Sequence, residues 1–422
     1  MSLRLDDVLI SLGIEAHREA IEPQWAASEA VYPGDGPECL TEAWVRAERE
    51  YVGLPREAEA ALLEAARGIA RRPELAHLLW HCERLLYEEP GYDWGGFSRW
   101  PTFGAALGEH AGCFYLLVGM AAAPRARRAH QARGIPDAVT RDTWSHLDES
   151  VRVYQDEHGG AFGLAPRTMF WFRNHAVGEL FRFGRLEFMC RPFYHRLHVF
   201  RHVETGEVVA LAGEGTRFDA EGLVDTRGSE DGWTARLLEA DESVTGCPIS
   251  PMGHAVRGEV TLPRNQWRLA LQRGDYVLET HIPAGGGMTP EACRDSMQRA
   301  LEFFPRYFPE RSFKGFGCDS WILNPQLEWI YRPDSNMVLF QRELYLYPVA
   351  SGDRSGLYFV FGEDDPDPVS APRDTSLRRA LADHLARGGR VIGGGMFLLT
   401  EDFARFGGQV YRSMWPPSVL VR

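Results

Sequence analysis

DYVLETHIPAGGGMTPEACRDSMQRALEFF, residues 275–304, is the stretch that decides the fold. Its first part, residues 276–282, predicts a strand, and three glycines follow. A helix is predicted from Pro290, with Thr289 as the N-cap and Glu291 in the first turn. Apolar residues then recur at helical spacing: Ala292, Met297, Ala300, Leu301 and Phe304. The sequence therefore predicts a strand, a glycine turn and a helix, with the turn at the amino end of the helix.

The glycine turn is a candidate anion site. Unpaired amide hydrogens and the helix dipole meet there, and glycines let a ligand approach the backbone closely. A coenzyme diphosphate is one anion that would fit. The residues expected to hold it are Ala284, Gly285, Gly286, Gly287, Met288 and Thr289. The alternative is a tight strand-to-helix turn that binds nothing.

Outward from this stretch, the chain predicts an α+β fold. Residues 1–140 have the composition and period of helices. Mixed strands and helices follow, including predicted strands at 344–350 and 356–362 and a predicted helix at 375–389. We expect a helical domain over residues 1–140, then an α+β domain with a first part at 141–250 and a second at 251–422.

The composition indicates which partners and which cellular compartment to expect. The net charge of −13 argues against nucleic acid or an anionic membrane as the main partner. No apolar run approaches the roughly 18–20 residues that span a bilayer, and the start MSLRLDDVLISLGIE lacks the features of a signal peptide. Seven dispersed cysteines without a CxxC pair indicate reduced thiols. We therefore expect a cytoplasmic protein; its oligomeric state stays open.

No metal site is expected. His195, His198 and His202 are close in sequence, but on a strand only the last two share a face. No carboxylate or cysteine completes a zinc set with them.

Four blocks of sequence carry a resemblance to a known family. They are FWFRNHAVGELFRFGRLEF (170–188), the stretch from Leu262 to Glu310 that contains the glycine turn, FKGFGCDSWILNPQLEWIYRPDSNMVLFQ (313–341) and TSLRRALADHLARGG (375–389). In this order they resemble bacterial acyltransferase-domain proteins, which combine an N-acyltransferase N-terminal domain with a GNAT-like C-terminal domain. The resemblance assigns the part at 141–250 to the first kind of domain and the part at 251–422 to the second.

The resemblance implies a function. In a GNAT-type sheet, acyl-CoA lies between two splayed strands with its diphosphate on the turn that matches Ala284 to Met288. The amine of a small molecule or peptide would attack the thioester directly, with acyl-CoA as the co-substrate and no metal. The segment IPAGGGM (282–288) lacks the leading Gln or Arg of the superfamily pattern. A second function therefore stays open: a non-catalytic protein that binds a ligand or an acyl carrier on a degenerate GNAT fold.

Glu279 and His281 are candidate bases. They lie two residues apart on the predicted strand, so they share a face next to the turn. Acyl transfer to an amine needs a base because an ammonium group is not a nucleophile. Histidine titrates near neutrality, whereas glutamate needs burial to raise its pKa. The alternative is a structural polar pair at the end of a strand.

Cys318 and Asp319 lie on the next predicted strand, on opposite faces. Cys318 with His281 would form a nucleophile pair and an acyl-enzyme, and a buried apolar cysteine is the alternative. Asp319 would act as a base or hold the amine. The departing thiolate also needs a proton donor, for which Tyr331, Tyr345 and Tyr347 are available. The sequence does not choose among the three.

Overall fold

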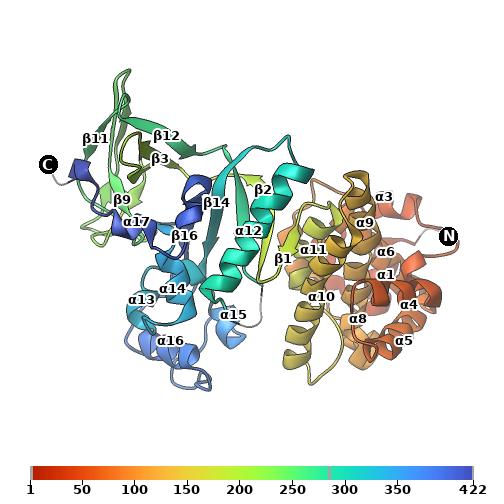
Figure 1. The fold of residues 1–422 in the computed structure, drawn as a ribbon. Coiled ribbons are helices and arrows are strands. Elements are labelled where there is room, and N and C mark those ends of the chain that lie inside the picture. The colour runs from red at the N-terminus through yellow and green to blue at the C-terminus, as the bar shows by residue number, and fades with distance from the viewer. Residues whose placement is uncertain (1–2, 284–286, 421–422) are drawn as a thin grey trace. The chain divides into compact units, whose positions relative to one another are not determined.

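The computed structural model describes residues 3–283 and 287–420 and forms two compact units (Figure 1). The first comprises Met1–Phe183 with Pro283–Gly285, and the second comprises Gly184–Ile282 with Gly286–Arg422. The division differs from the ranges expected from the sequence: it follows Phe183, because the two helices after residue 136 pack on the helical region before them.

The first unit is helical. Short 3-10 helices connect its elements, which are α1 Leu5–Leu12, α2 Arg18–Ile21, α3 Trp25–Ala30, α4 Glu42–Tyr51, α5 Ala58–Ala70, α6 Pro73–Tyr87, α7 Gly104–Leu107, α8 Ala111–Met120, α9 Ala122–Ala132, α10 Asp137–Glu157, α11 Met169–Ala176 and the strand β1 Phe181–Phe183. Two of these helices begin where the sequence supplies a cap or a proline. The Thr41 hydroxyl accepts a hydrogen bond from the Trp44 amide at the start of α4, and Pro73 opens α6.

Helix α8 forms the centre of this unit. Every residue from Gly112 to Met120 is buried, and α8 packs against α5, α6 and α9. The stretch Gly104–Ala132 is long and apolar enough to cross a membrane by length and composition, which corrects the expectation that no such run exists. In its most apolar window 61% of the residues are buried, so a central position in the bundle accounts for the composition.

The main sheet of the second unit contains the strand and helix of residues 275–304. Its strands run in the order β2, β13, β14, β16, β15. Their bounds are β2 Leu186–Pro192, β13 Tyr276–His281, β14 Phe313–Ser320, β15 Tyr345–Pro348 and β16 Gly394–Leu399. The central pair β13 and β14 is parallel and is connected through α12 Pro290–Tyr307, while the other pairs are antiparallel. The α+β prediction is confirmed, as are the predicted strand and the predicted helix on either side of the glycines.

A second group of strands completes this unit. It contains the sheet β10-β9-β4-β3-β12, the sheet β11-β8-β7 and the hairpin β5-β6. The bounds are β3 Leu197–His202, β4 Val208–Ala212, β5 Arg217–Phe218, β6 Trp233–Thr234, β7 Leu237–Glu239, β8 Ser243–Gly246, β9 Pro248–Ser250, β10 His254–Ala255, β11 Val260–Pro263 and β12 Trp267–Gln272. The buried Tyr345 hydroxyl links the two groups, because it donates to the Ile249 carbonyl and accepts from the Ala210 amide.

Short helices cover the carboxyl-terminal part: α13 Leu327–Ile330, α14 Asn336–Arg342, α15 Leu357–Phe361, α16 Ser376–Ala386 and α17 Val410–Ser413. Helix α16 begins at its capping Thr375, as predicted. The strand predicted at residues 356–362 is wrong, because this segment forms α15. Gly356 and Gly362 adopt left-handed conformations at its two ends, and the Gly356 Cα lies directly against the ring of Trp321.

Candidate functional site

The two parallel strands at the centre of the main sheet stop pairing before either strand ends. Their last paired residues are Glu279 on β13 and Gly317 on β14. Strand β13 continues to His281 and stays paired with β2, while β14 continues to Ser320 and stays paired with β16. Within the described part of the chain, each strand therefore keeps its outer neighbour while the two carboxyl ends separate from each other.

Helix α12 begins just beyond the end of β13. The Thr289 hydroxyl accepts a hydrogen bond from the Ala292 amide at 3.2 Å, which caps the helix as predicted. Three of the predicted anion-binding residues, Ala284, Gly285 and Gly286, lie outside the described residues. The other three, Gly287, Met288 and Thr289, lead directly into the helix.

The described part of the turn keeps backbone donors available. Gly287 is exposed, and Met288 is buried. Among residues 3–283 and 287–420, the backbone N–H groups of Gly287, Thr289 and Glu291 have no hydrogen-bond partner. These donors lie at the amino end of a helix of 18 residues, where the dipole favours an anion.

Three of the four predicted catalytic residues share one face of the sheet. Because Glu279 lies opposite Gly317 and strands alternate their faces, Glu279, His281 and Asp319 point to the same side. The Glu279 Oε2 atom lies 3.7 Å from His281 Nε2. The structure thus brings these three side chains to the end of the sheet where β13 and β14 separate.

Two residues that the sequence analysis did not select as catalytic lie at Asp319. The Tyr194 hydroxyl donates a hydrogen bond to Asp319 Oδ1, and His195 Nε2 lies 3.7 Å from the same oxygen. Both belong to the loop between β2 and β3, whereas the sequence analysis considered His195 only as a strand residue and a metal ligand. The available signal was the cluster of aromatic and imidazole side chains in Phe193-Tyr194-His195, directly after a strand.

The pKa of Asp319 is shifted by opposing effects. Burial raises it, but the neighbouring His195, the hydrogen bond from Tyr194 and the nearby His281 lower it, and the net pKa is below the usual value. Asp319 therefore stays a carboxylate at neutral pH. A carboxylate in this position orients the imidazole that it faces and stabilises its protonated form. This environment favours a holding role for Asp319 over a role as the base.

Cys318 lies on the opposite face of β14, with Met396 as its neighbour on β16. Burial raises the pKa of its thiol well above the usual value, and the charges of Asp319 and Glu279 raise it further. The thiolate is the nucleophilic form, so these surroundings do not favour the covalent alternative.

Of the three candidate proton donors, Tyr347 has the setting that fits best. The Tyr331 hydroxyl is hydrogen-bonded to Ser376 at 2.8 Å, and Tyr345 links the two sheets. The Tyr347 hydroxyl is buried and has no hydrogen-bond partner in the described residues. Its ring packs edge-on against His195 with centroids 5.0 Å apart.

Gly395 provides the space for this ring. A Cβ atom there would lie 2.1 Å from the Tyr347 ring, so only glycine fits at this position without displacing the ring. Tyr347 lies opposite Gly395, and Gly395 lies opposite Asp319, so all three belong to the face of Glu279 and His281.

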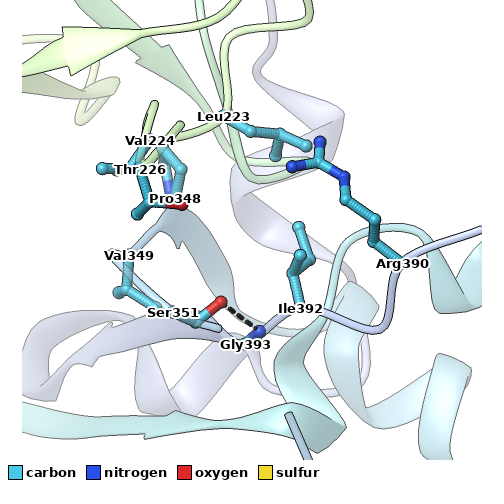
Figure 2. Close-up of a pocket in the computed structure, with 9 residues that line it drawn as sticks. All are labelled: Leu223, Val224, Thr226, Pro348, Val349, Ser351, Arg390, Ile392 and Gly393. Carbon is cyan, nitrogen blue, oxygen red and sulfur yellow. Dashed lines mark hydrogen bonds between the residues drawn. The ribbon is translucent and has the colours of Figure 1, made fainter. Parts of the chain in front are cut away.

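Two further observations bear on possible ligands. In the described ranges, no group of three or more His, Cys, Asp or Glu side chains is arranged to hold a metal ion. Figure 2 shows a small hollow in the second unit, where the Ser351 hydroxyl accepts a hydrogen bond from the Gly393 amide at 2.9 Å. The hollow has room for about one water molecule, and none of the candidate residues lines it. It is therefore too small to be a substrate site.

Comparisons with known proteins give two family matches. Residues 45–178 match the model of an N-acyltransferase N-terminal domain, and residues 180–397 match the model of a GNAT-like C-terminal domain. Among curated proteins, none matches the chain.

Solved structures with the same fold are acyltransferases. One, in complex with decanoyl-CoA and teicoplanin, is 24% identical with a TM-score of 0.64, and the match covers 94% of this chain and 99% of that one. An acyltransferase mutant with octanoyl-CoA is also 24% identical, with a TM-score of 0.63 and coverage of 93% and 99%. A complex with CoA and 10C-teicoplanin is 24% identical, with a TM-score of 0.62 and coverage of 94% and 100%. At this level of identity the likeness shows a shared fold.

Proposed function

Because the chain belongs to the family with a GNAT-like C-terminal domain, we propose that it is an acyltransferase that uses acyl-CoA and acylates an amine. One observation carries the proposal: β13 and β14 separate after Glu279 and Gly317 while each keeps its outer neighbour. In a GNAT-type sheet, the thioester donor lies in such a gap. The similar structures that hold octanoyl-CoA, decanoyl-CoA or CoA support acyl-CoA as that donor.

In the proposed reaction, the donor lies between the separated strand ends. Backbone N–H groups of β13 would polarise the thioester carbonyl and stabilise the oxyanion. The diphosphate would contact the backbone donors of Gly287, Thr289 and Glu291. This arrangement places the reacting carbonyl on the face that carries Asp319 and His281.

His195 is the base that the geometry supports best. Its Nε2 atom faces Asp319, so Nδ1 is left to take a proton from the acceptor amine, directly or through water. An acceptor that arrives as an ammonium ion first loses one proton to solvent. As the neutral amine nitrogen attacks the thioester carbon, His195 takes the proton that leaves this nitrogen, so the tetrahedral intermediate carries a neutral nitrogen. When the tetrahedral intermediate collapses, the C–S bond breaks and the thiolate takes a proton from the Tyr347 hydroxyl, which His195 restores through solvent. The products are an amide and CoA. Glu279 and His281 remain candidates for the same proton transfer.

The acceptor is proposed to be the amine of a small molecule or a peptide. Two of the similar structures hold teicoplanin or 10C-teicoplanin, which supports this class. The net charge of −13 and the carboxylates Glu279 and Asp319 favour a cationic acceptor over a nucleic acid. We propose that the reaction takes place in the cytoplasm.

Calorimetry with acetyl-, octanoyl- and decanoyl-CoA tests the proposal. We expect at least one to bind, and we expect CoA release when an amine is added. Absence of binding by all three to the intact protein would overturn the proposed function. Binding without CoA release from any amine in a broad panel would instead support a ligand-binding protein.

A further inference from the structure

Phe193 begins the short loop that carries Tyr194 and His195. The loop lies between β2, which ends at Pro192, and β3, which begins at Leu197. Loops move more than the elements that they connect, so a base on a loop needs something that fixes its position. Tyr194 is 52% exposed, whereas Phe193 is 3% exposed. Phe193 is therefore the anchored part of this loop.

The backbone of Phe193 is hydrogen-bonded to the turn that precedes β13. Its N–H donates to the Asp275 carbonyl at 2.7 Å, and its carbonyl accepts from the Gly274 amide at 2.8 Å. Gly274 has a φ of 95°, in the left-handed region that favours glycine. The Asp275 carboxylate accepts from the Gln272 amide at 2.9 Å and so stabilises the same turn. Main-chain bonds thus hold the start of the loop against the segment that leads into β13.

The ring of Phe193 lies over the last paired residue of β14. A Cβ atom built on Gly317 would lie 3.6 Å from Phe193 Cδ2, on the face of the sheet that carries Asp319. The centroid of the Phe193 ring lies 5.4 Å from that of His195 and 6.2 Å from that of Tyr347. Phe193 is therefore next to both side chains to which the proposed reaction assigns a proton transfer.

We infer that Phe193 is a positioning residue that fixes the place of His195 on the sheet. The inference rests on the proposed function and adds to it the group that holds the base. Asp319 sets how the imidazole is turned, because its carboxylate faces Nε2. Phe193 sets where the imidazole lies, because its ring separates the loop from Gly317 and its backbone keeps the loop from shifting along the sheet. The ring is buried, so it acts through the base and not on the acceptor.

Steady-state kinetics and calorimetry on Phe193→Ala test the inference. Removal of the ring should displace the base and lower kcat by about 10²-fold, the usual effect of a displacement of roughly 1 Å at a catalytic group. The Kd for octanoyl-CoA should stay unchanged, because the backbone groups that would hold the donor are not altered. In a His195→Ala background the same substitution should lower kcat by less than about twofold, since the base through which it acts is already absent.

Phe218→Ala is the matched control. Phe218 is also a buried phenylalanine of the second unit, and its ring packs against Trp233 in the hairpin β5-β6 with centroids 5.0 Å apart. This variant should lower the Tm and leave the kcat of the folded protein unchanged. Phe193→Leu keeps most of the apolar volume, so it should fold even where Phe193→Ala does not. Its kcat should still fall, because a branched aliphatic side chain does not reproduce the flat ring beside the imidazole.

Four results would contradict the inference. A kcat of Phe193→Leu equal to that of wild type would overturn it and leave the proposed function intact. Equal fold-losses from Phe193→Ala in the wild-type and His195→Ala backgrounds would also overturn it, because the ring would then not act through the base. A loss of kcat in Phe218→Ala as large as in Phe193→Ala would reduce the effect to general destabilisation. If the wild type releases no CoA from any donor and amine, the proposed function fails, and the inference fails with it.

Discussion

At the scale of single residues, one carboxylate organises the candidate site. Asp319 accepts a hydrogen bond from Tyr194 and lies 3.7 Å from His195 Nε2. Its lowered pKa keeps it ionised at neutral pH, so it can hold an imidazole that gains a proton during the reaction. In the proposed reaction, the loop after β2 contributes the base, and β14 contributes the group that orients it.

Replacement of His195 tests this assignment. His195→Ala should lower kcat by about 10²–10⁴-fold, the usual contribution of a general base, and leave the Kd for octanoyl-CoA unchanged. Asp319→Asn should lower kcat less, because the imidazole remains. Steady-state kinetics with calorimetry separates the two effects. Glu279→Gln and His281→Gln serve as controls: a larger loss in either of them than in His195→Ala would move the base to β13.

Two glycines give opposite predictions for the same substitution. Within residues 3–283 and 287–420, an added Cβ at Gly287 meets only Asn336 and Thr289, at 3.7 and 3.8 Å, so Gly287→Ala should fold normally. It should nevertheless weaken the binding of octanoyl-CoA, because the added methyl group would lie where the diphosphate approaches the backbone. At Gly395 the added Cβ lies 2.1 Å from the Tyr347 ring, so Gly395→Ala should lower the Tm. Thermal melts and calorimetry check both, and unchanged affinity in Gly287→Ala would contradict an anion site there.

At the scale of elements, the sequence predicted those that carry strong local signals. Thr289, Pro290 and Glu291 marked the start of α12, and Thr375 marked the start of α16. The segment 356–362 was assigned wrongly because a short apolar run fits a strand and a helix equally well. Its conformation depends on the left-handed glycines at its ends and on the packing of Gly356 against Trp321, which is a tertiary contact.

The candidate site was predictable only in part for the same reason. Glu279 and His281 could be placed on one face because they share a strand. Asp319 could be added because its strand was expected to pair beside them. Tyr194 and His195 reach Asp319 across 125 and 124 positions of the chain, and no local pattern encodes that approach. The family could still be predicted from the ordered sequence blocks, and that prediction is confirmed.

At the scale of the whole molecule, the stability of the helical unit should depend on pH through Glu83. Burial raises the pKa of this carboxyl from 4.5 to about 7, although Arg125 at 3.2 Å lowers it in part. The folded state therefore binds an extra proton between these two values. Stability from this group is present below about pH 4.5 and is lost as pH rises through about 7.

Glu83→Gln removes this titration. Relative to wild type, the variant should gain stability between pH 5 and pH 8, by up to about 3 kcal/mol. His81 and His130, whose pKa values burial lowers to about 4, act in the opposite direction, but they are present in both proteins and cancel in the difference. Differential scanning calorimetry can resolve the transitions of separate units. Glu109→Gln is the control, because it removes an exposed carboxylate of the same unit; a parallel pH dependence of wild type and Glu83→Gln would contradict the prediction.

The separation of β13 and β14 has a consequence for how such a protein can diverge. A ligand that fills the missing part of the ladder is held by main-chain groups, and main-chain groups survive almost every point mutation. The surrounding side chains, including a basic or amide residue before the turn, can therefore be substituted during evolution while the donor site is retained. Substitutions at such a site should change which thioester binds best before they abolish thioester binding.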